Sequence, residues 1–202
     1  MTAEQFWNEF KELFNEDNDF IKKAKDCWKN RADFTKIIIP KLSTILQKYQ
    51  YEKYAQYEYY NIDLIGWKNR KSERLATPPK TKNYKLKKHF WYLGVAVEHE
   101  NDQTDWTDEL VKLLYINCPL RVVIGYYSEE LSKENLEEIT NYAATLIHSA
   151  NANQALVAEK QQYLLILGKN HINPDNLNKE SYTPYLYKNG IFEDMSNKTN
   201  WS

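Results

Sequence analysis

Two short stretches of the chain decide how its fold is read: residues 61–65, Asn-Ile-Asp-Leu-Ile, and residues 94–101, Gly-Val-Ala-Val-Glu-His-Glu-Asn. Both are apolar runs of strand-forming residues, and Asp63 closes the first while Glu98 and Glu100 end the second. Side chains two apart on a strand share a face and stand ~6.6–7 Å apart. Glu98 and Glu100 therefore point the same way as Ala96 and Gly94, two small residues that leave room for something to approach the backbone.

A cation site follows if the two stretches are neighbouring strands. Asp63, Glu98 and Glu100 would then converge as three carboxylates at one place. Hard divalent cations such as Mg²⁺ take oxygen ligands and keep open positions for water and phosphate. The alternative is that Glu98 and Glu100 form the solvated end of a strand and that Asp63 points elsewhere.

The order of these motifs resembles a known superfamily. An Asp on one strand, Glu-x-Glu on the next, then an amphipathic helix and another apolar strand resemble the PD-(D/E)XK nucleases, which have the restriction-endonuclease-like fold. The resemblance covers roughly residues 57–127, about a third of the chain. Its last motif position is Glu100 instead of the usual Lys, and in this it resembles the Glu-x-Glu variant of some type II restriction enzymes.

The resemblance implies roles for named residues. Asp63 and Glu98 would bind Mg²⁺ or Mn²⁺, with the main-chain carbonyl of His99 as a further ligand. Such an ion polarises the scissile phosphate and activates a water molecule. Glu100 would act as a base or hold a second metal. Lys112, on the following helix, would restore the lost positive charge, although an ordinary surface Glu-Lys pair is the alternative for it.

The connection between the two strands is strongly basic. Residues 67–89 carry nine basic side chains against one acidic side chain, Glu73, which leaves a net charge of −9 for the rest of a chain whose total is −1. Such asymmetry favours contact with a polyanion, while a solvated loop kept soluble by its charge is the alternative. The expected DNA-contacting residues are Lys68, Arg70, Lys71, Arg74, Lys80, Lys82, Lys85, Lys87 and Lys88.

Composition bounds the function classes. A chain of 202 residues with 42% hydrophobic residues can form one folded domain. With only 5 Gly it has neither a Walker A nor a Rossmann fingerprint, which excludes functions that rest on those nucleotide sites. The two cysteines, Cys27 and Cys118, have no disulfide or metal-ligand spacing. The N-terminus begins an amphipathic helix without a signal peptide, and no apolar run reaches ~20 residues, so we expect a cytoplasmic protein without a membrane span.

Periodicity and turn signals predict the elements. We expect helices over 3–15 and around 20–28, a third with Pro40 in its first turn, one beginning near 104 and one from a Ser132 cap to about 152. Strands are expected over 57–67, 87–100, 120–126 and 163–167, followed by a hairpin at 185–192 with Asn189-Gly190 as its turn.

This order predicts an α/β fold with a mixed central β-sheet flanked by helices, a restriction-endonuclease-like core with extra N-terminal helices. We expect one domain over 1–202, made of an N-terminal helical part (1–50), an α/β core (57–195) and a frayed tail (196–202).

Three interpretations of function remain. The first is a metal-dependent nuclease that hydrolyses DNA phosphodiester bonds in restriction or repair, for which the resemblance also suggests a homodimer that cuts both strands. The second is a catalytically inactive module of the same fold that binds nucleic acid or protein. The third is an unrelated α/β accessory protein whose acidic strand end is surface only.

Overall fold

The structure is a computed structural model, and it describes residues 1–15, 19–28, 30–51, 56–59, 61–69, 91–100, 106–128, 132–153, 161–170, 172–198 and 201. The elements are α1 (Ala3–Glu12), α2 (Asp19–Cys27), α3 (Arg31–Lys48), β1 (Gln56–Tyr59), β2 (Ile62–Asn69), β3 (Trp91–His99), α4 (Trp106–Leu114), β4 (Leu120–Tyr127), α5 (Lys133–Asn153), β5 (Gln162–Lys169), the short 3-10 helices η1 (Pro174–Asn176) and η2 (Lys179–Ser181), β6 (Tyr182–Lys188) and β7 (Ile191–Asp194).

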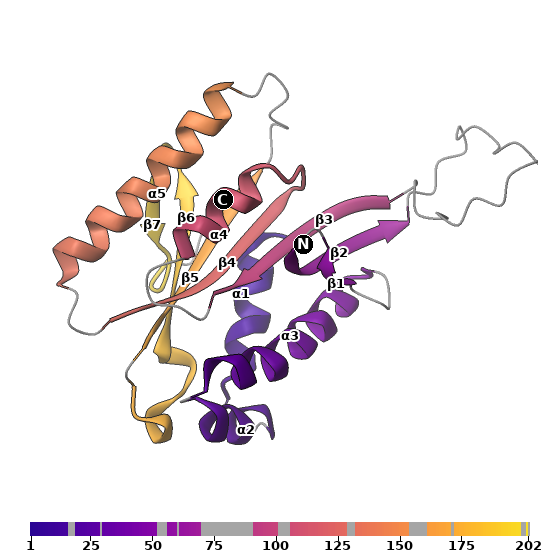
Figure 1. Ribbon diagram of the computed structural model, residues 1–202, viewed down its shortest axis with the longest axis vertical. Helices are drawn as coiled ribbons and strands as arrows, with labels where there is room; N and C mark the ends of the chain where they lie inside the picture. The colour runs from indigo at the N-terminus through magenta and orange to yellow at the C-terminus, as the bar shows by residue number, and fades with distance from the viewer. Residues whose placement is uncertain are drawn as a thin grey trace, which may run out of the picture.

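The described strands form one seven-stranded sheet in chain order, β1 to β7 (Figure 1). The central pairs β3–β4 and β4–β5 are parallel and are joined through α4 and α5, whereas the four outer pairs are antiparallel. β4 is buried along nearly its whole length, as its mainly apolar sequence, in which Arg121 is the one charged residue, predicts for a central parallel strand. The expected α/β fold with a mixed sheet flanked by helices is confirmed.

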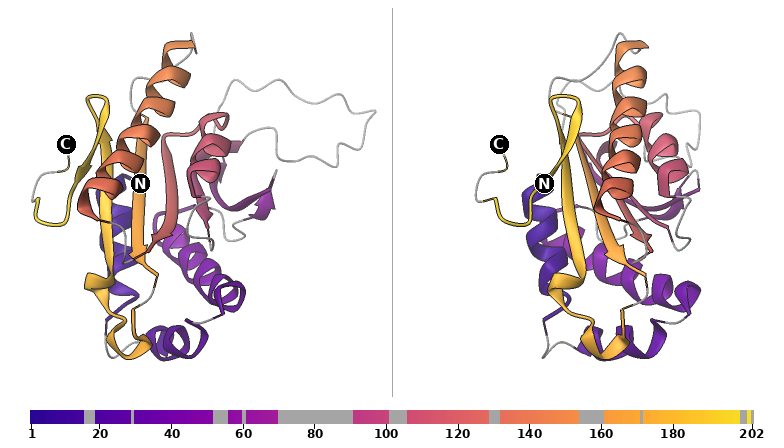
Figure 2. Two further views of the ribbon diagram at one scale, coloured as in Figure 1. Left: turned by 60° about the vertical axis from the view of Figure 1, so that its left-hand side comes forward. Right: turned by 90° about the vertical axis from the view of Figure 1, so that its left-hand side faces the viewer.

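Helices cover both faces of the sheet (Figure 2). Helices α1 and α3 pack on one face, with α2 against α3 and η1, and Phe6, Phe10 and Phe34 join Val95 and Val97 in one apolar cluster. Helices α4 and α5 pack on the other face in a second cluster. Trp106, Leu110, Leu113 and Leu114 are the buried positions of α4, as their spacing predicts. The strands therefore separate two cores, and the polar groups at the ends of β2 and β3 lie between them.

The third helix begins earlier than expected. It starts at Arg31, capped by Asn30, so Pro40 lies inside the helix and not in its first turn. Pro40 removes one backbone hydrogen bond, which usually costs about 3 kcal/mol or more in a helix interior. The helix continues because Phe34, Ile38 and Leu42 are fully buried on either side of the proline. Pro40 itself is on the exposed side, where water can reach the freed carbonyl.

The predicted strand over 57–67 is divided in the structure. β1 and β2 form a hairpin in which Tyr59 pairs with Ile62, and the connection contains Asn61 at a φ of 60°. Asparagine tolerates this left-handed conformation because its short polar side chain can bond locally. The apolar pattern continues across the turn, so the sequence alone predicts a single strand here. Asp63 therefore stands near the start of β2 and does not close a strand.

Other local predictions agree with the structure. Ser132 Oγ accepts a hydrogen bond from the Asn135 N–H at 3.2 Å at the start of α5. Asn189 and Gly190 have positive φ between β6 and β7, as an Asn-Gly type I′ turn requires. The expectation of a frayed tail is wrong at Trp201, which is buried in the cluster with the N-terminal helices. A large apolar ring near a chain end gains more from burial than the end loses in freedom.

Much of the basic connection lies outside the described residues. Of its nine predicted DNA-contacting residues only Lys68 is described, and its ammonium group lies 4.6 Å from the centre of the Tyr51 ring. The other eight, from Arg70 to Lys88, fall in the part of the chain that the structure leaves undescribed. Among the described helices none combines the length and the apolar character needed to span a membrane.

Candidate functional site

Antiparallel pairing brings Asp63 and Glu98 together. β2 and β3 pair Leu64 with Val97, so Asp63, one residue before Leu64, faces Glu98, one residue after Val97. Directly opposed residues of an antiparallel pair have their side chains on the same face. The start of β2 thus meets the end of β3. The expected meeting of Asp63 and Glu98 on neighbouring strands is present, although it arises from opposite ends of the two strands.

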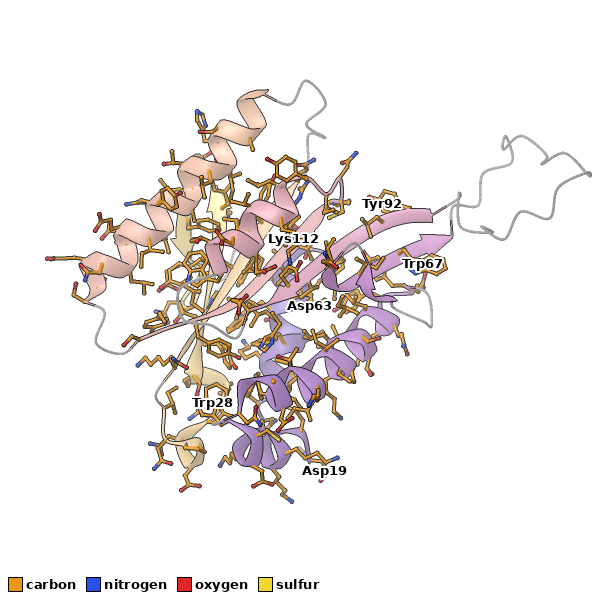
Figure 3. All side chains as sticks on the ribbon, in the orientation of Figure 1. Asp19, Trp28, Asp63, Trp67, Tyr92 and Lys112 are labelled. Atoms are coloured by element: carbon orange, nitrogen blue, oxygen red, sulfur yellow. The ribbon has the colours of Figure 1, made fainter. Side chains whose placement is uncertain are left out.

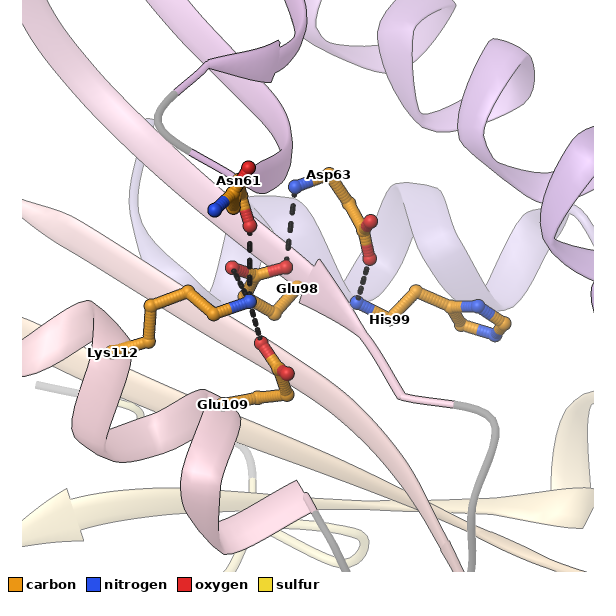
Figure 4. A network of polar contacts seen from close by, with 6 residues as sticks. All are labelled: Asn61, Asp63, Glu98, His99, Glu109 and Lys112. Atoms are coloured by element: carbon orange, nitrogen blue, oxygen red, sulfur yellow. Dashed lines mark hydrogen bonds and ion pairs between the residues drawn. The ribbon is translucent and has the colours of Figure 1, made fainter.

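Side-chain oxygens replace the backbone ladder at this point (Figure 4). The Asp63 N–H donates to Glu98 Oε2 at 3.2 Å, and the His99 N–H donates to Asp63 Oδ2 at 2.8 Å. Each carboxylate therefore accepts a hydrogen bond from the main chain of the opposite strand. The exchange holds both carboxylates in fixed positions where the strands stop pairing, and it leaves the second oxygen of each for other partners.

Lys112 reaches the same place from α4. Its ammonium nitrogen lies 3.0 Å from Glu98 Oε1 and pairs with Glu109, one turn earlier on the helix. It also donates a hydrogen bond to the main-chain oxygen of Asn61 at 3.0 Å. In Figure 3, Lys112 and Asp63 lie near the middle of the sheet, away from Trp67 at the end of β2. A contact between Lys112 and Glu109 alone would have been the surface pair considered from the sequence, and the structure adds Glu98.

The electrostatics of the site follow from burial. Glu98 is only 1% exposed, and desolvation raises the pKa of its carboxyl to about 8 against the opposing contact with the Lys112 ammonium group, with the nearby charges of Asp63 and Glu109 adding to the rise. Burial also raises the pKa of Asp63, while the His99 N–H opposes that rise. Burial of Lys112 acts to lower its pKa, but its contacts with Glu109 and Glu98 outweigh this effect and raise the pKa.

This burial rules out one alternative for Glu98. A solvated strand end would leave the side chain in water, whereas Glu98 is covered by α4 and by the neighbouring strands. Carboxylates are almost never fully buried unless they are paired, and groups with strongly shifted pKa values gather at functional sites. The location of Glu98 is therefore typical of a functional carboxylate or of a buried ion pair.

Glu100 does not complete a three-carboxylate site. It follows the last residue of β3, and its N–H donates to the Ile124 oxygen on β4 at 2.9 Å. Within the described ranges, no group of three or more His, Cys, Asp or Glu side chains is arranged to hold a metal ion. The N–H bond continues the parallel β3–β4 ladder, and the expected three-carboxylate metal group of Asp63, Glu98 and Glu100 is not found among the described residues.

The remaining residues fit a smaller metal site. Mg²⁺ usually keeps several waters and is bound through one or two carboxylates together with substrate phosphates. Asp63 and Glu98 supply two such carboxylates, held in place by main-chain N–H groups. Their donor chemistry therefore suits Mg²⁺ or Mn²⁺ without Glu100. Whether the His99 carbonyl is a further ligand stays a prediction.

The His99 side chain has a structural role. Its ring is buried, with Nδ1 3.1 Å from Thr35 Oγ1 and Nε2 2.9 Å from the Tyr126 hydroxyl, which in turn lies 3.2 Å from the Tyr182 hydroxyl. Both ring nitrogens are engaged, so the imidazole is a satisfied core group, as its place on the apolar face of β3 predicts. The network anchors the end of β3 from the side of α3.

The space expected beside Gly94 is filled. The pairing of β2 with β3 passes from Gly66–Val95 to Trp67–Leu93, so Gly94 is the extra residue of a β-bulge. A Cβ at Gly94 would lie 2.6 Å from the Tyr51 ring. The bulge turns Gly94 toward Tyr51, on the side of the N-terminal helices, and Gly94 therefore leaves no open room next to the carboxylates.

Sequence reasoning missed two participants. From the sequence, Glu109 is only the acidic member of an ordinary surface Glu-Lys pair with Lys112, and no pattern points to the Asn61 carbonyl. The spacing of Glu109 and Lys112, three apart, was the available signal for their pairing. No local pattern could show that α4 lies across the start of β2.

Comparison of the chain with known proteins identifies no relative. No protein-family model, curated protein or solved structure matches the chain.

Proposed function

We propose that this protein is a metal-dependent nuclease that hydrolyses phosphodiester bonds in DNA. The observation that carries the proposal is the pair of hydrogen bonds that fix the two carboxylates where β2 and β3 stop pairing. Glu98 accepts from the Asp63 N–H, and Asp63 accepts from the His99 N–H. Mg²⁺ or Mn²⁺ bound there would polarise the scissile phosphate and lower the pKa of a bound water. The order of elements from β2 to β4 agrees with the order on which the resemblance to the PD-(D/E)XK superfamily rests.

Lys112 supplies the positive charge that position 100 lacks. Its ammonium group lies beside Glu98 and reaches solvent through a side chain that is about one-third exposed. An ammonium in this position attracts the phosphate and stabilises negative charge that develops during hydrolysis. The ion pair with Glu109 keeps the Lys112 ammonium group next to Glu98. Asp63 and Glu98 thus position the cation, and Lys112 contacts the anionic substrate.

The test is cleavage of supercoiled plasmid, single-stranded DNA and RNA in Mg²⁺, in Mn²⁺ and with chelator. Asp63→Asn and Glu98→Gln keep an oxygen that can accept the observed N–H bonds but remove the charge that binds metal. We expect wild type to cleave DNA and both variants to lose roughly 100-fold or more in rate. Asp33→Asn, which removes a surface carboxylate paired with Lys36, is the matched control and should cleave like wild type. Equal cleavage by all four proteins would contradict the proposal.

The second candidate is a nuclease-fold module without catalysis that binds nucleic acid or protein. The observation that favours it is the Lys112–Glu98 ion pair, which neutralises the buried carboxylate without any metal. On this proposal wild type binds DNA in a salt-dependent way, and no substrate is cleaved in either metal. Cleavage that Asp63→Asn removes would exclude it.

A further inference from the structure

Three oxygen atoms from three separate parts of the chain surround the ammonium group of Lys112. They are Glu98 Oε1 on β3, Glu109 Oε2 on α4 and the main-chain oxygen of Asn61 before β2. Figure 4 shows the nitrogen between the two carboxylates, with the Asn61 carbonyl on the side of β2. We call these three oxygens the oxygen cage.

The oxygen cage has the character of a cation site. Glu98 Oε1 and Glu109 Oε2 are both buried, and neither accepts a hydrogen bond of ordinary geometry from the described residues. Lys112 therefore meets them as a charge that lies between them and not as an aligned donor. Two carboxylates and a main-chain carbonyl are also ligands that hard divalent cations accept. A buried carboxylate needs a compensating positive charge, and a bound metal ion could provide it as well as an ammonium group does.

We infer that the oxygen cage is a divalent-cation site and that Lys112 is its built-in competitor. Without metal, the ammonium group occupies the cage. When Mg²⁺ or Mn²⁺ enters, the ammonium group of Lys112 moves out of the cage toward solvent, which its partly exposed side chain already reaches. It is then free to contact an anion such as a phosphate. The competition lowers the apparent metal affinity by the fraction of molecules in which the cage is open.

This inference deepens the proposed function, because it rests on the same carboxylate, Glu98, and gives Lys112 a reason to reach the substrate only after metal has bound. It does not require hydrolysis. Metal binding and the release of Lys112 can be measured in a protein that cleaves nothing, so the two proposals can fail separately.

The first experiment compares metal binding by calorimetry in wild type, Lys112→Met and Lys48→Met. Methionine keeps much of the lysine stem without its charge. Lys48 lies outside the oxygen cage, where its ammonium nitrogen is 2.6 Å from Glu9 Oε2. Its replacement by Met changes the net charge of the protein by the same amount as Lys112→Met. We expect Lys112→Met to bind Mn²⁺ ~10-fold or more tightly than wild type, as for a cage open in about a tenth of molecules or fewer. Lys48→Met should bind like wild type. Unchanged affinity in Lys112→Met would overturn the inference.

A measurement on wild type avoids the effect of a variant that folds poorly. Reductive methylation of lysines, followed by mass spectrometry, reports how accessible each ammonium group is. We expect saturating Mn²⁺ to increase the labelling of Lys112 and to leave Lys48 unchanged. Lys112 labelling that stays constant, or that rises equally with Lys48, would overturn the inference.

A third protein identifies the ligands. Glu109→Gln combined with Lys112→Met removes one carboxylate of the cage but keeps Asp63 and Glu98. The gain in Mn²⁺ affinity should disappear in this double variant, and a full gain would overturn the cage as the site.

If Lys112→Met binds tightly while wild type cleaves no nucleic acid, the nuclease proposal fails and the cage stands. If wild type cleaves and Lys112→Met binds no tighter, the outcome is the reverse.

Discussion

Replacing Glu98 by Gln tests the electrostatics of the site in a stability measurement. Burial raises the pKa of the Glu98 carboxyl from an ordinary 4.5 to about 8. Between these values the folded protein holds a proton that the unfolded chain has released, so folded stability falls as pH rises. Below about pH 4.5 the carboxyl is protonated in both states and contributes no penalty, and above about pH 8 the penalty is complete.

The size follows from the same two values. One ionising group changes the free energy of unfolding by about 1.4 kcal/mol per pH unit within its window. From pH 5 to pH 8 the wild type should therefore lose at most about 4 kcal/mol from Glu98, and less to the extent that the Lys112 ammonium group stabilises the ionised form. Glutamine cannot ionise, and its Oε can still accept the Asp63 N–H. Glu98→Gln should gain stability relative to wild type as pH rises, by about 2–4 kcal/mol over this range if the buried carboxylate relaxes partly toward water.

The assay is urea unfolding of both proteins at pH 5, 6, 7 and 8, with the difference in unfolding free energy plotted against pH. Titrating groups far from Glu98 cancel in this difference, whereas Asp63 and Lys112, which contact Glu98, contribute to it. Glu9→Gln is the control, because its pair with Lys48 is at the surface and contributes only about 0–1 kcal/mol. A Glu98→Gln difference that stays flat would refute the reasoning. A difference of opposite slope would mean that Lys112 holds the pKa of Glu98 below its ordinary value.

Three further predictions concern other parts of the chain. Arg121 is buried and donates to the carbonyls of Leu113, Cys118 and Ile116, so Arg121→Met should lower the unfolding free energy by about 2–4 kcal/mol in urea titrations, and an unchanged midpoint would contradict it. A Cβ at Gly125 would lie 2.7 Å from Trp106 Cβ, so Gly125→Ala should cost about 1–3 kcal/mol in the same assay; a neutral result would mean that α4 can shift. In the basic connection, joint replacement of Lys80, Lys82 and Lys85 by Ala should reduce the slope of log DNA affinity against log salt by up to ~0.9 per lost phosphate contact, and an unaltered slope would remove those lysines from the interface.

Local sequence patterns predicted several elements because the information they need lies within a few residues. The Asn189-Gly190 turn, the Ser132 cap and the buried face of α4 each depend on neighbours in the chain. The mainly apolar sequence of β4, with Arg121 as its one charged residue, is enough to predict a strand covered on both faces. Local reasoning also identified Asp63 and Glu98, since both lie in short apolar runs of strand-forming residues where strand alternation fixes the face of each side chain.

Tertiary structure decided what those patterns leave open. Pro40 stays inside α3 because apolar residues before and after it are buried against the sheet, a long-range gain that helix propensity does not include. Gly94 faces Tyr51 because a bulge changes the register of β3. Trp201 is buried by contacts with residues far away in the sequence.

The candidate site divides in the same way. The sequence by itself determined that Asp63 lies in an apolar strand and that Glu98 lies at the end of another. Only the tertiary structure placed Lys112 against Glu98, left Glu100 out of a three-carboxylate group and brought the Asn61 carbonyl to the ammonium group. The physical reason is that charge pairing depends on distances of a few ångströms between elements, and these are set by how α4 packs across the sheet and not by any spacing along the chain.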